Sequence, residues 1–296
     1  MLKPRKEFIY LNINIFQLPR RVCCAAFLAV LAMLHGCVSI PSVQDRTKNA
    51  QQLAAQQGWE AHIIKTPSFN LMSYQPPMHQ IEQLTIYIEG DGLAWITSRQ
   101  VSSNPTPSNP LALKLALSDS TSTSVYLARP CQFVTDKYRH GCENKYWTNA
   151  RFSPEVISAM NQAVSQLKEK FQASRLVLVG YSGGGAVAAL LASMRDDVVK
   201  LITIAGNLDH QEWTDFHHIS PLKGSLNAAD YRQQLSAIEQ IHFVGEKDKV
   251  IPPFLAQRFI GGLSVSAKAK VVVVPEQTHG CCWDSLWPDV LLGLQK

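Results

Sequence analysis

The chain of 296 residues is poor in charge and contains no long apolar run. Charged residues make up 17% of it and hydrophobic residues 46%, with 16 glycines and 16 prolines. This composition excludes a disordered, collagen-like or coiled-coil protein. The length suits one or two domains, and about 250 residues can fold as a single α/β unit with a sizeable core.

Net positive charge is scarce outside the first residues of the chain. The formal net charge is +5, but residues 1–36 hold an excess of basic side chains and the rest of the chain is nearly neutral. The charged residues of this segment are Lys3, Arg5, Lys6, Glu7, Arg20 and Arg21. A nearly neutral body lacks the charge that nucleic-acid binding needs, so we expect no nucleic-acid partner.

The N-terminal segment has the pattern of an export signal. Residues 22–34 (VCCAAFLAVLAML) carry no charge. That run is short for spanning a bilayer, which takes about 20 residues, but it fits the apolar part of a secretory signal. The sequence therefore predicts a signal peptide over residues 1–36. An ordinary cleaved signal and an uncleaved anchor are the alternatives to lipidation of the next residue, Cys37.

The end of this segment, Leu34-His35-Gly36-Cys37, resembles the lipobox of bacterial lipoproteins. His35 stands where that family prefers a small residue. The resemblance implies cleavage before Cys37 and acylation of its thiol, with palmitate among the attached chains. The residue after the cysteine is Val38 and not Asp, which resembles lipoproteins sent to the outer membrane. We therefore expect a lipid anchor in the outer membrane, with the protein facing the periplasm.

Export would place the remaining cysteines in an oxidising compartment. Cys131 and Cys142 bracket one polar loop and are the favoured disulfide pair, although four cysteines allow three connectivities. Whether Cys281 and Cys282 are free or bonded stays open. A zinc site formed by His279 and these two cysteines is the competing interpretation. The spacing of the three residues does not form the paired clusters of zinc sites, so no metal and no cofactor are expected.

The rest of the chain divides into a tether and one body. Residues 37–58 are polar and rich in glutamine, which predicts a flexible tether, and residues 59–296 are expected to form the folded domain. In this domain, short β-branched runs alternate with helix-period segments, which is typical of βαβ units in a mainly parallel sheet. Strands are predicted at 61–65, 69–74, 83–89, 124–128, 175–179, 199–205, 240–244 and 269–274, the first two as a hairpin. Helices are predicted at 110–117, 154–171, 184–194, 253–260 and 284–294.

A candidate nucleophile follows the strand predicted at 175–179. Residues 180–184 read Gly-Tyr-Ser-Gly-Gly, a G-x-S-x-G pattern between a strand and a helix. The glycines permit a sharp turn that lifts the Ser182 hydroxyl above the sheet. A glycine-rich turn with an incidental serine is the alternative, and a phosphate-binding loop is disfavoured because no Gly-Lys-Ser/Thr follows.

A serine needs a base and an acid that orients the base, and both follow later strands. Asp248 lies in Gly-Glu-Lys-Asp-Lys-Val-Ile-Pro after the predicted strand at 240–244, and His279 precedes Gly280 after the last predicted strand. The order serine, acid, histidine resembles the α/β-hydrolase fold family. The resemblance implies a three-layer fold, with about eight mostly parallel strands and helices on both faces. Glu246 and Asp209 remain alternative acids.

The same resemblance implies an oxyanion hole made of backbone N–H groups. One is that of Gly183, and the other is that of Asp91 in the loop Glu89-Gly90-Asp91-Gly92. Glu89 replaces the histidine usual in this family. A carboxylate at Asp91 beside a developing anion must point away or be neutralised, and a plain turn-forming role for Asp91 is the alternative.

Two further segments are candidates for shaping a substrate pocket. Residues 206–235 are long for a connection, and similar hydrolases carry a cap insertion here. Its aromatic and histidine side chains could line a pocket or pack on the surface; they are Trp213, Phe216, His217 and His218. Residues 129–152 present the same two alternatives.

These residues together predict an exported serine hydrolase. The expected reaction is attack of Ser182 on an ester, thioester or amide of a small-molecule or lipid-like acyl substrate, with an acyl-enzyme intermediate. The alternatives are a non-catalytic binding or scaffolding lipoprotein on the same fold, and an acyltransferase that uses the same three residues.

The lipobox resemblance generates a direct test. We expect radiolabelled palmitate to be incorporated into the wild-type protein in bacterial cells and to be lost from Cys37→Ser, because the thiol is the acylated atom. A Cys24→Ser variant, changed within the apolar run, is the matched control and should keep the label. Label that persists in Cys37→Ser would refute the lipoprotein assignment.

Overall fold

The computed structural model describes residues 40–294. The predicted signal peptide and Cys37 lie outside this range, so the predictions of export and lipidation stay predictions. Among the described residues, no helix is both long and apolar enough to cross a bilayer.

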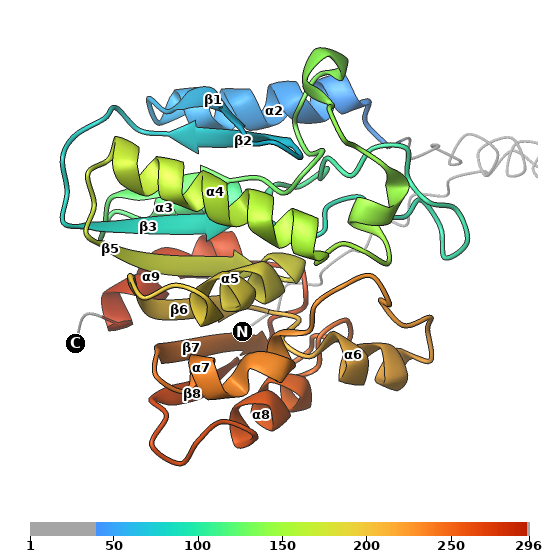
Figure 1. Cartoon of the computed structure of the whole chain (residues 1–296), viewed down its shortest axis with the longest axis vertical. Helices are drawn as coiled ribbons and strands as arrows, with labels where there is room; N and C mark the ends of the chain where they lie inside the picture. The colour runs from blue at the N-terminus through green and yellow to red at the C-terminus, as the bar shows by residue number, and fades with distance from the viewer. Residues whose placement is uncertain (1–39, 295–296) are drawn as a thin grey trace, which may run out of the picture. The chain divides into compact units, whose positions relative to one another are not determined.

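The described residues form one eight-stranded sheet in the order β1-β2-β4-β3-β5-β6-β7-β8. In Figure 1 it runs from β1 near the top to β8 near the bottom. β2 is antiparallel to both neighbours and every other pairing is parallel. The strands are β1 Glu60–Lys65, β2 Asn70–Gln75, β3 Gln83–Ile88, β4 Ser124–Leu127, β5 Arg175–Tyr181, β6 Val198–Ile204, β7 Glu239–Gly245 and β8 Ala269–Val274. All eight predicted strands are present, and the expected hairpin is β1-β2.

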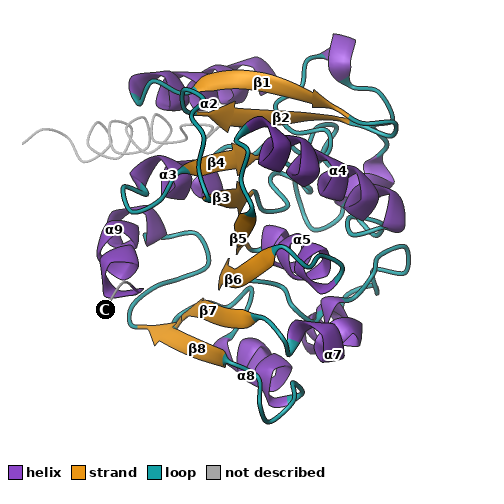
Figure 2. Cartoon of the chain, turned by 60° about the vertical axis from the view of Figure 1, so that its left-hand side comes forward, coloured by secondary structure: helices purple, strands orange, loops and turns teal. Residues whose placement is uncertain are grey.

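Helices cover both faces of the sheet, as Figure 2 shows. Those on one face are α4 Pro154–Lys170, α5 Gly183–Ser193, α7 Arg232–Leu235 and α8 Pro253–Gly261. Those on the other are α2 Val43–Gln56, α3 Leu111–Ser118 and α9 Trp283–Leu294. Two buried apolar clusters result, one on each face of the sheet. The predicted three-layer arrangement with a mostly parallel sheet is confirmed.

Local sequence accounts for the longest of these helices. The Ser153 hydroxyl accepts a hydrogen bond from the Val156 N–H, and Pro154 occupies the first turn. Both features favour a helix start at this position. The buried residues of α4 recur at helical spacing, so one stripe faces the sheet. The helix ends at Lys170, one residue before the predicted end.

The expectation of a flexible tether over residues 37–58 is wrong for residues 43–56, which form helix α2. Ser42 caps the helix, and the side chains of Ala50 and Ala54 are almost completely buried. Arg46 is buried too and donates to the backbone oxygen of Thr106. The small alanines let the helix lie close to the body, so few large apolar residues were needed and the segment resembled a linker.

Burial of α2 can be tested with two neighbouring substitutions to aspartate. Ala50→Asp places a charge where no solvent reaches, so we expect a loss of about 2 kcal/mol or more in the free energy of unfolding. Gln51→Asp adds the same charge on the exposed side of the same helix and should change stability by less than about 0.5 kcal/mol. Urea unfolding measures both. Equal values would mean that α2 does not pack on the body.

Candidate active site

Ser182 lies at the tight turn between β5 and α5. Its backbone has φ +51° and ψ −120°, a conformation that residues other than glycine rarely adopt. The strain is held by the packing around it: a Cβ added to Gly184 would overlap the backbone oxygens of Ile88 and Glu89. Helix α5 therefore begins against the end of β3, and the serine hydroxyl stands at the carboxyl edge of the sheet.

The structure brings the three predicted catalytic side chains together. His279 Nε2 lies 2.9 Å from Ser182 Oγ, and His279 Nδ1 lies 2.9 Å from Asp248 Oδ2. These distances allow the imidazole to accept the serine proton while the carboxylate fixes its tautomer. The three residues come from the ends of β5, β7 and β8, as the alternating pattern predicts.

Asp248 is held by its own turn. Its side chain is inaccessible to solvent, and Oδ1 accepts hydrogen bonds of 2.8 Å from the backbone N–H groups of Val250 and Ile251. The alternative acids are occupied elsewhere: Glu246 accepts from the Glu276 N–H, and Asp209 caps helix α6 (His210–His217). Asp248 is therefore the carboxylate that reaches the histidine.

Two aromatic residues hold the loop of His279. Tyr181 Oη and Trp283 Nε1 both donate to the His279 backbone oxygen at 3.2 Å. The zinc alternative finds no support, because both ring nitrogens of His279 face Asp248 and Ser182. Within residues 40–294, no group of three metal-ligating side chains could hold a metal ion.

The two segments that carry the predicted oxyanion donors are in contact. A Cβ added to Gly183 would overlap Oδ1 of Asp91, so the loop after β3 touches the first residue of α5. Within the described residues, no hydrogen bond engages the backbone N–H of Asp91 or of Gly183. Two unpaired N–H groups next to Ser182 are the arrangement that stabilises a tetrahedral oxyanion.

The Asp91 carboxylate is neutralised rather than turned away from the site. Arg129 Nη1 lies 3.1 Å from Oδ1, and Arg151 Nη1 lies 2.5 Å from Oδ2. Burial raises the pKa of Asp91, but the two guanidinium groups outweigh burial and leave the pKa below its ordinary value. Asp91 is therefore a charged carboxylate in a buried ion-pair cluster rather than a plain turn former.

Glu89 is a second buried carboxyl beside the serine, and within residues 40–294 it forms no salt bridge. Its oxygens accept from the N–H of Gly90 at 2.9 Å and from the Tyr126 hydroxyl at 3.1 Å. Burial raises the pKa of Glu89 to about 7, against these hydrogen bonds, which lower it. The Ala112 N–H also points at Glu89, so the carboxyl serves the first turn of α3, which has no side-chain cap of its own.

A cavity of about 300 Å³ opens on Ser182 and His279. Besides these two, its walls are Glu89, Asp91, Gly92, Leu93, Pro107, Ser108, Asn109 and Tyr181. Residues 206–235 do not line it. Trp213 and His217 instead contact the backbone oxygen of Val250 at 2.8 Å, and Phe216 packs on Phe254. This segment braces the turn of Asp248, which supports the surface-packing alternative.

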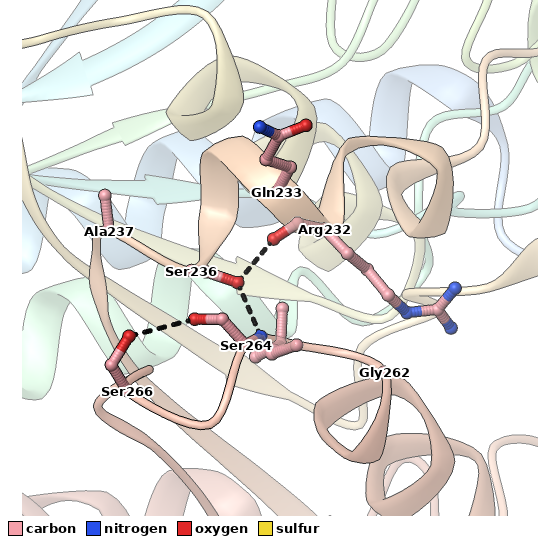
Figure 3. A pocket seen from close by; sticks show the side chains of 8 residues that line it. Arg232, Gln233, Ser236, Ala237, Gly262, Ser264 and Ser266 are labelled. Carbon is pink, nitrogen blue, oxygen red and sulfur yellow. Dashed lines mark hydrogen bonds between the residues drawn. The ribbon is translucent and has the colours of Figure 1, made fainter.

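A larger depression of about 570 Å³ lies beside α7 and the residues that follow α8 (Figure 3). The Ser236 hydroxyl there donates to the Arg232 backbone oxygen and accepts from the Ser264 N–H, at 2.7 and 2.9 Å. The Arg232 side chain extends away from these hydroxyls and pairs with Asp209. No residue of the triad lines this depression, so the smaller cavity is the candidate active site.

The structure joins the cysteines in two pairs. Cys131 and Cys142 form a disulfide with Cα atoms 5.7 Å apart, a separation usual for such bonds. Cys281 and Cys282 are joined to each other across a cis peptide bond. The first bond lies within residues 129–151, the segment whose two end arginines reach Asp91.

Sequence reasoning missed Arg129, Arg151 and the cavity wall at residues 107–109. Arg129 carried a usable signal, because it is a charged residue two positions after a fully buried strand, at the edge where ligands bind. Arg151 and residues 107–109 follow no strand directly. Only long-range packing brings them to the site.

One family model matches part of the chain. Residues 119–215, about a third of the chain, match the family described as Lipase (class 3). No curated protein sequence matches the chain.

Solved structures match most of the chain at low identity. Est1E from Butyrivibrio proteoclasticus is similar at 14% identity and TM-score 0.55, over 79% of this chain and 97% of its own. An alpha-beta serine hydrolase homologue from Coxiella burnetii has 15% identity and TM-score 0.55, over 79% and 95%. The Pyrococcus furiosus esterase Pf2001 has 12% identity and TM-score 0.56, over 80% and 90%. The chain has the α/β-hydrolase fold.

The buried Glu89 generates a pH prediction. Its pKa is raised from an ordinary 4.5 to about 7 in the folded protein. The folded state then binds more protons than the unfolded state between these values. The stabilising contribution of protonated Glu89 is fully present below pH 4.5 and is lost as the pH rises through 7. We therefore expect the wild type to lose up to roughly 3 kcal/mol relative to Glu89→Gln between pH 4.5 and 8, measured by urea unfolding. Parallel curves for the two proteins would contradict it.

Proposed function

We propose that the protein is a serine hydrolase that cleaves an ester bond through Ser182, His279 and Asp248. The observation that carries the proposal is the unbroken chain of contacts from Ser182 Oγ to His279 Nε2 and from His279 Nδ1 to Asp248, both at 2.9 Å. The lipase family match and the similarity to an esterase from Pyrococcus furiosus support it.

The first half of the reaction forms an acyl-enzyme. His279 Nε2 takes the proton of Ser182 Oγ as the oxygen bonds to the carbonyl carbon of the substrate. The carbonyl oxygen becomes an anion that accepts hydrogen bonds from the N–H groups of Asp91 and Gly183. When the tetrahedral intermediate collapses, the bond to the alcohol oxygen breaks and His279 gives that oxygen its proton.

The second half releases the acid. Water gives a proton to His279 Nε2 and attacks the acyl carbon, and the Ser182 ester bond breaks as the proton returns to Ser182 Oγ. Asp248 keeps its negative charge throughout and stabilises the imidazolium, because its oxygen accepts from His279 Nδ1. A thioester or amide follows the same steps with a sulfur or nitrogen leaving atom.

The proposal includes the place of action. The lipobox-like sequence ending at Cys37 supports an exported protein anchored by acyl chains, with the outer membrane, facing the periplasm, as its expected location. Helix α2 begins at Val43, so few residues separate the proposed anchor at Cys37 from the hydrolase domain. Such a domain is suited to small-molecule or lipid-like esters of the envelope.

A fluorophosphonate probe tests the hydrolase proposal. We expect the wild type to be labelled and both Ser182→Ala and His279→Ala to remain unlabelled, because the probe traps only an activated serine. Ser236→Ala, changed in the larger depression that lacks a triad, is the matched control and should label like the wild type.

The possible results separate the candidate functions. Labelling together with turnover of p-nitrophenyl acetate supports a hydrolase. Labelling with product formed only when an alcohol acceptor is added favours the acyltransferase. A folded wild type that takes no label would refute the enzyme proposal and favour the scaffolding alternative.

A further inference from the structure

Two arginines are buried against the wall of the active site and have no role in the steps above. The Arg129 and Arg151 side chains are 4% and 8% exposed, and both pair with Asp91. Arginine is almost never this buried without a partner, and here two guanidinium groups share one carboxylate. The cluster keeps an excess positive charge next to the oxyanion donors.

The arginines are themselves fixed by a frame within residues 129–152. Arg129 donates to the Arg151 backbone oxygen and lies over the Phe152 ring, 5.2 Å from its centroid. Arg151 Nε donates to the Thr148 backbone oxygen at 2.6 Å. Both guanidinium groups are therefore held rigidly before they meet Asp91, which lowers the cost of ordering them there.

The frame also grips the oxyanion loop at a second point. Gln132 accepts from the Arg129 N–H at 3.1 Å and donates to the Gly90 backbone oxygen at 2.9 Å. Cys131, next to Gln132, is bonded to Cys142. The loop is thus held through the Asp91 side chain and through the carbonyl of Gly90, which belongs to the same peptide group as the Asp91 N–H.

We propose that Arg129 and Arg151 are positioning residues of the oxyanion hole, which hold the Asp91 N–H toward the reacting carbonyl and cancel the Asp91 charge beside the oxyanion. The proposal rests on the hydrolase function proposed above. Without the arginines, a carboxylate packed against Gly183 would oppose the negative charge that develops in the transition state. The effect therefore falls on kcat rather than on substrate binding.

A purely structural ion-pair cluster is the competing account. Buried ion pairs add little net stability, since desolvation of the charges offsets their attraction. A structural role would lower the unfolding midpoint and leave the turnover of the folded enzyme unchanged. A positioning role changes turnover at temperatures where the variant is fully folded.

The experiment measures kcat and KM for p-nitrophenyl acetate and the rate of fluorophosphonate labelling, with unfolding midpoints for every variant. We expect Arg129→Gln and Arg151→Gln each to lower kcat about 100-fold while KM changes less than about 3-fold, as for the loss of one oxyanion donor. Arg175→Gln, at the opposite end of the strand that carries Ser182, is the matched control and should keep full activity.

Two further variants test charge separately from folding. Arg151→Lys keeps a cation but not the planar guanidinium, so we expect kcat to fall about 10-fold. We also expect this variant to fold even if Arg151→Gln does not. Adding Asp91→Asn to Arg151→Gln removes the uncompensated carboxylate and should recover about 10-fold of the lost kcat, since the N–H donor remains.

The outcomes distinguish the positioning role of the two arginines from the hydrolase function on which it rests. Arginine variants that are folded and retain kcat within about 3-fold of the wild type would overturn the positioning role and leave the hydrolase proposal standing. The same holds if the double variant recovers nothing. A wild type without labelling or turnover would overturn both.

Discussion

The close approach of helix α5 to the end of β3 is the constraint on which the active site depends. Ser182 keeps a positive φ only because the glycines after it let the helix start against the backbone of Ile88 and Glu89. The same contact sets Asp91 against Gly183, the residue next to the nucleophile. Backbone held by backbone in this way is rigid, as preorganised catalysis requires.

This close approach places two carboxyl groups beside the serine, and the fold treats them differently. Asp91 is kept ionised by Arg129 and Arg151, whereas Glu89 forms no salt bridge within the described residues and its pKa is raised by burial. One group therefore contributes a paired charge, and the other accepts a hydrogen bond from the first turn of α3. The difference follows from neighbours supplied by residues 129–152, which contact the loop after β3 through Arg129, Gln132 and Arg151.

Much of the fold follows from local sequence. Alternation of β-branched runs with helical periodicity predicted all eight strands, because each central strand is buried on both faces and must be apolar along its length. Chain order and strand ends predicted that Ser182, Asp248 and His279 would meet, and the structure brings them together. Helix α2 escaped prediction, since a helix that packs through two alanines leaves almost no apolar pattern.

The catalytic roles of individual residues could be predicted from the sequence, whereas their electrostatic environment could not. G-x-S-x-G, the turn around Asp248 and the His-Gly pair are local patterns that short-range geometry dictates. The state of Asp91 depends on Arg151, sixty positions away, and on a cysteine-closed loop between them. Coulomb attraction acts through space and burial is a property of the whole fold, so no local pattern can reveal which charges meet.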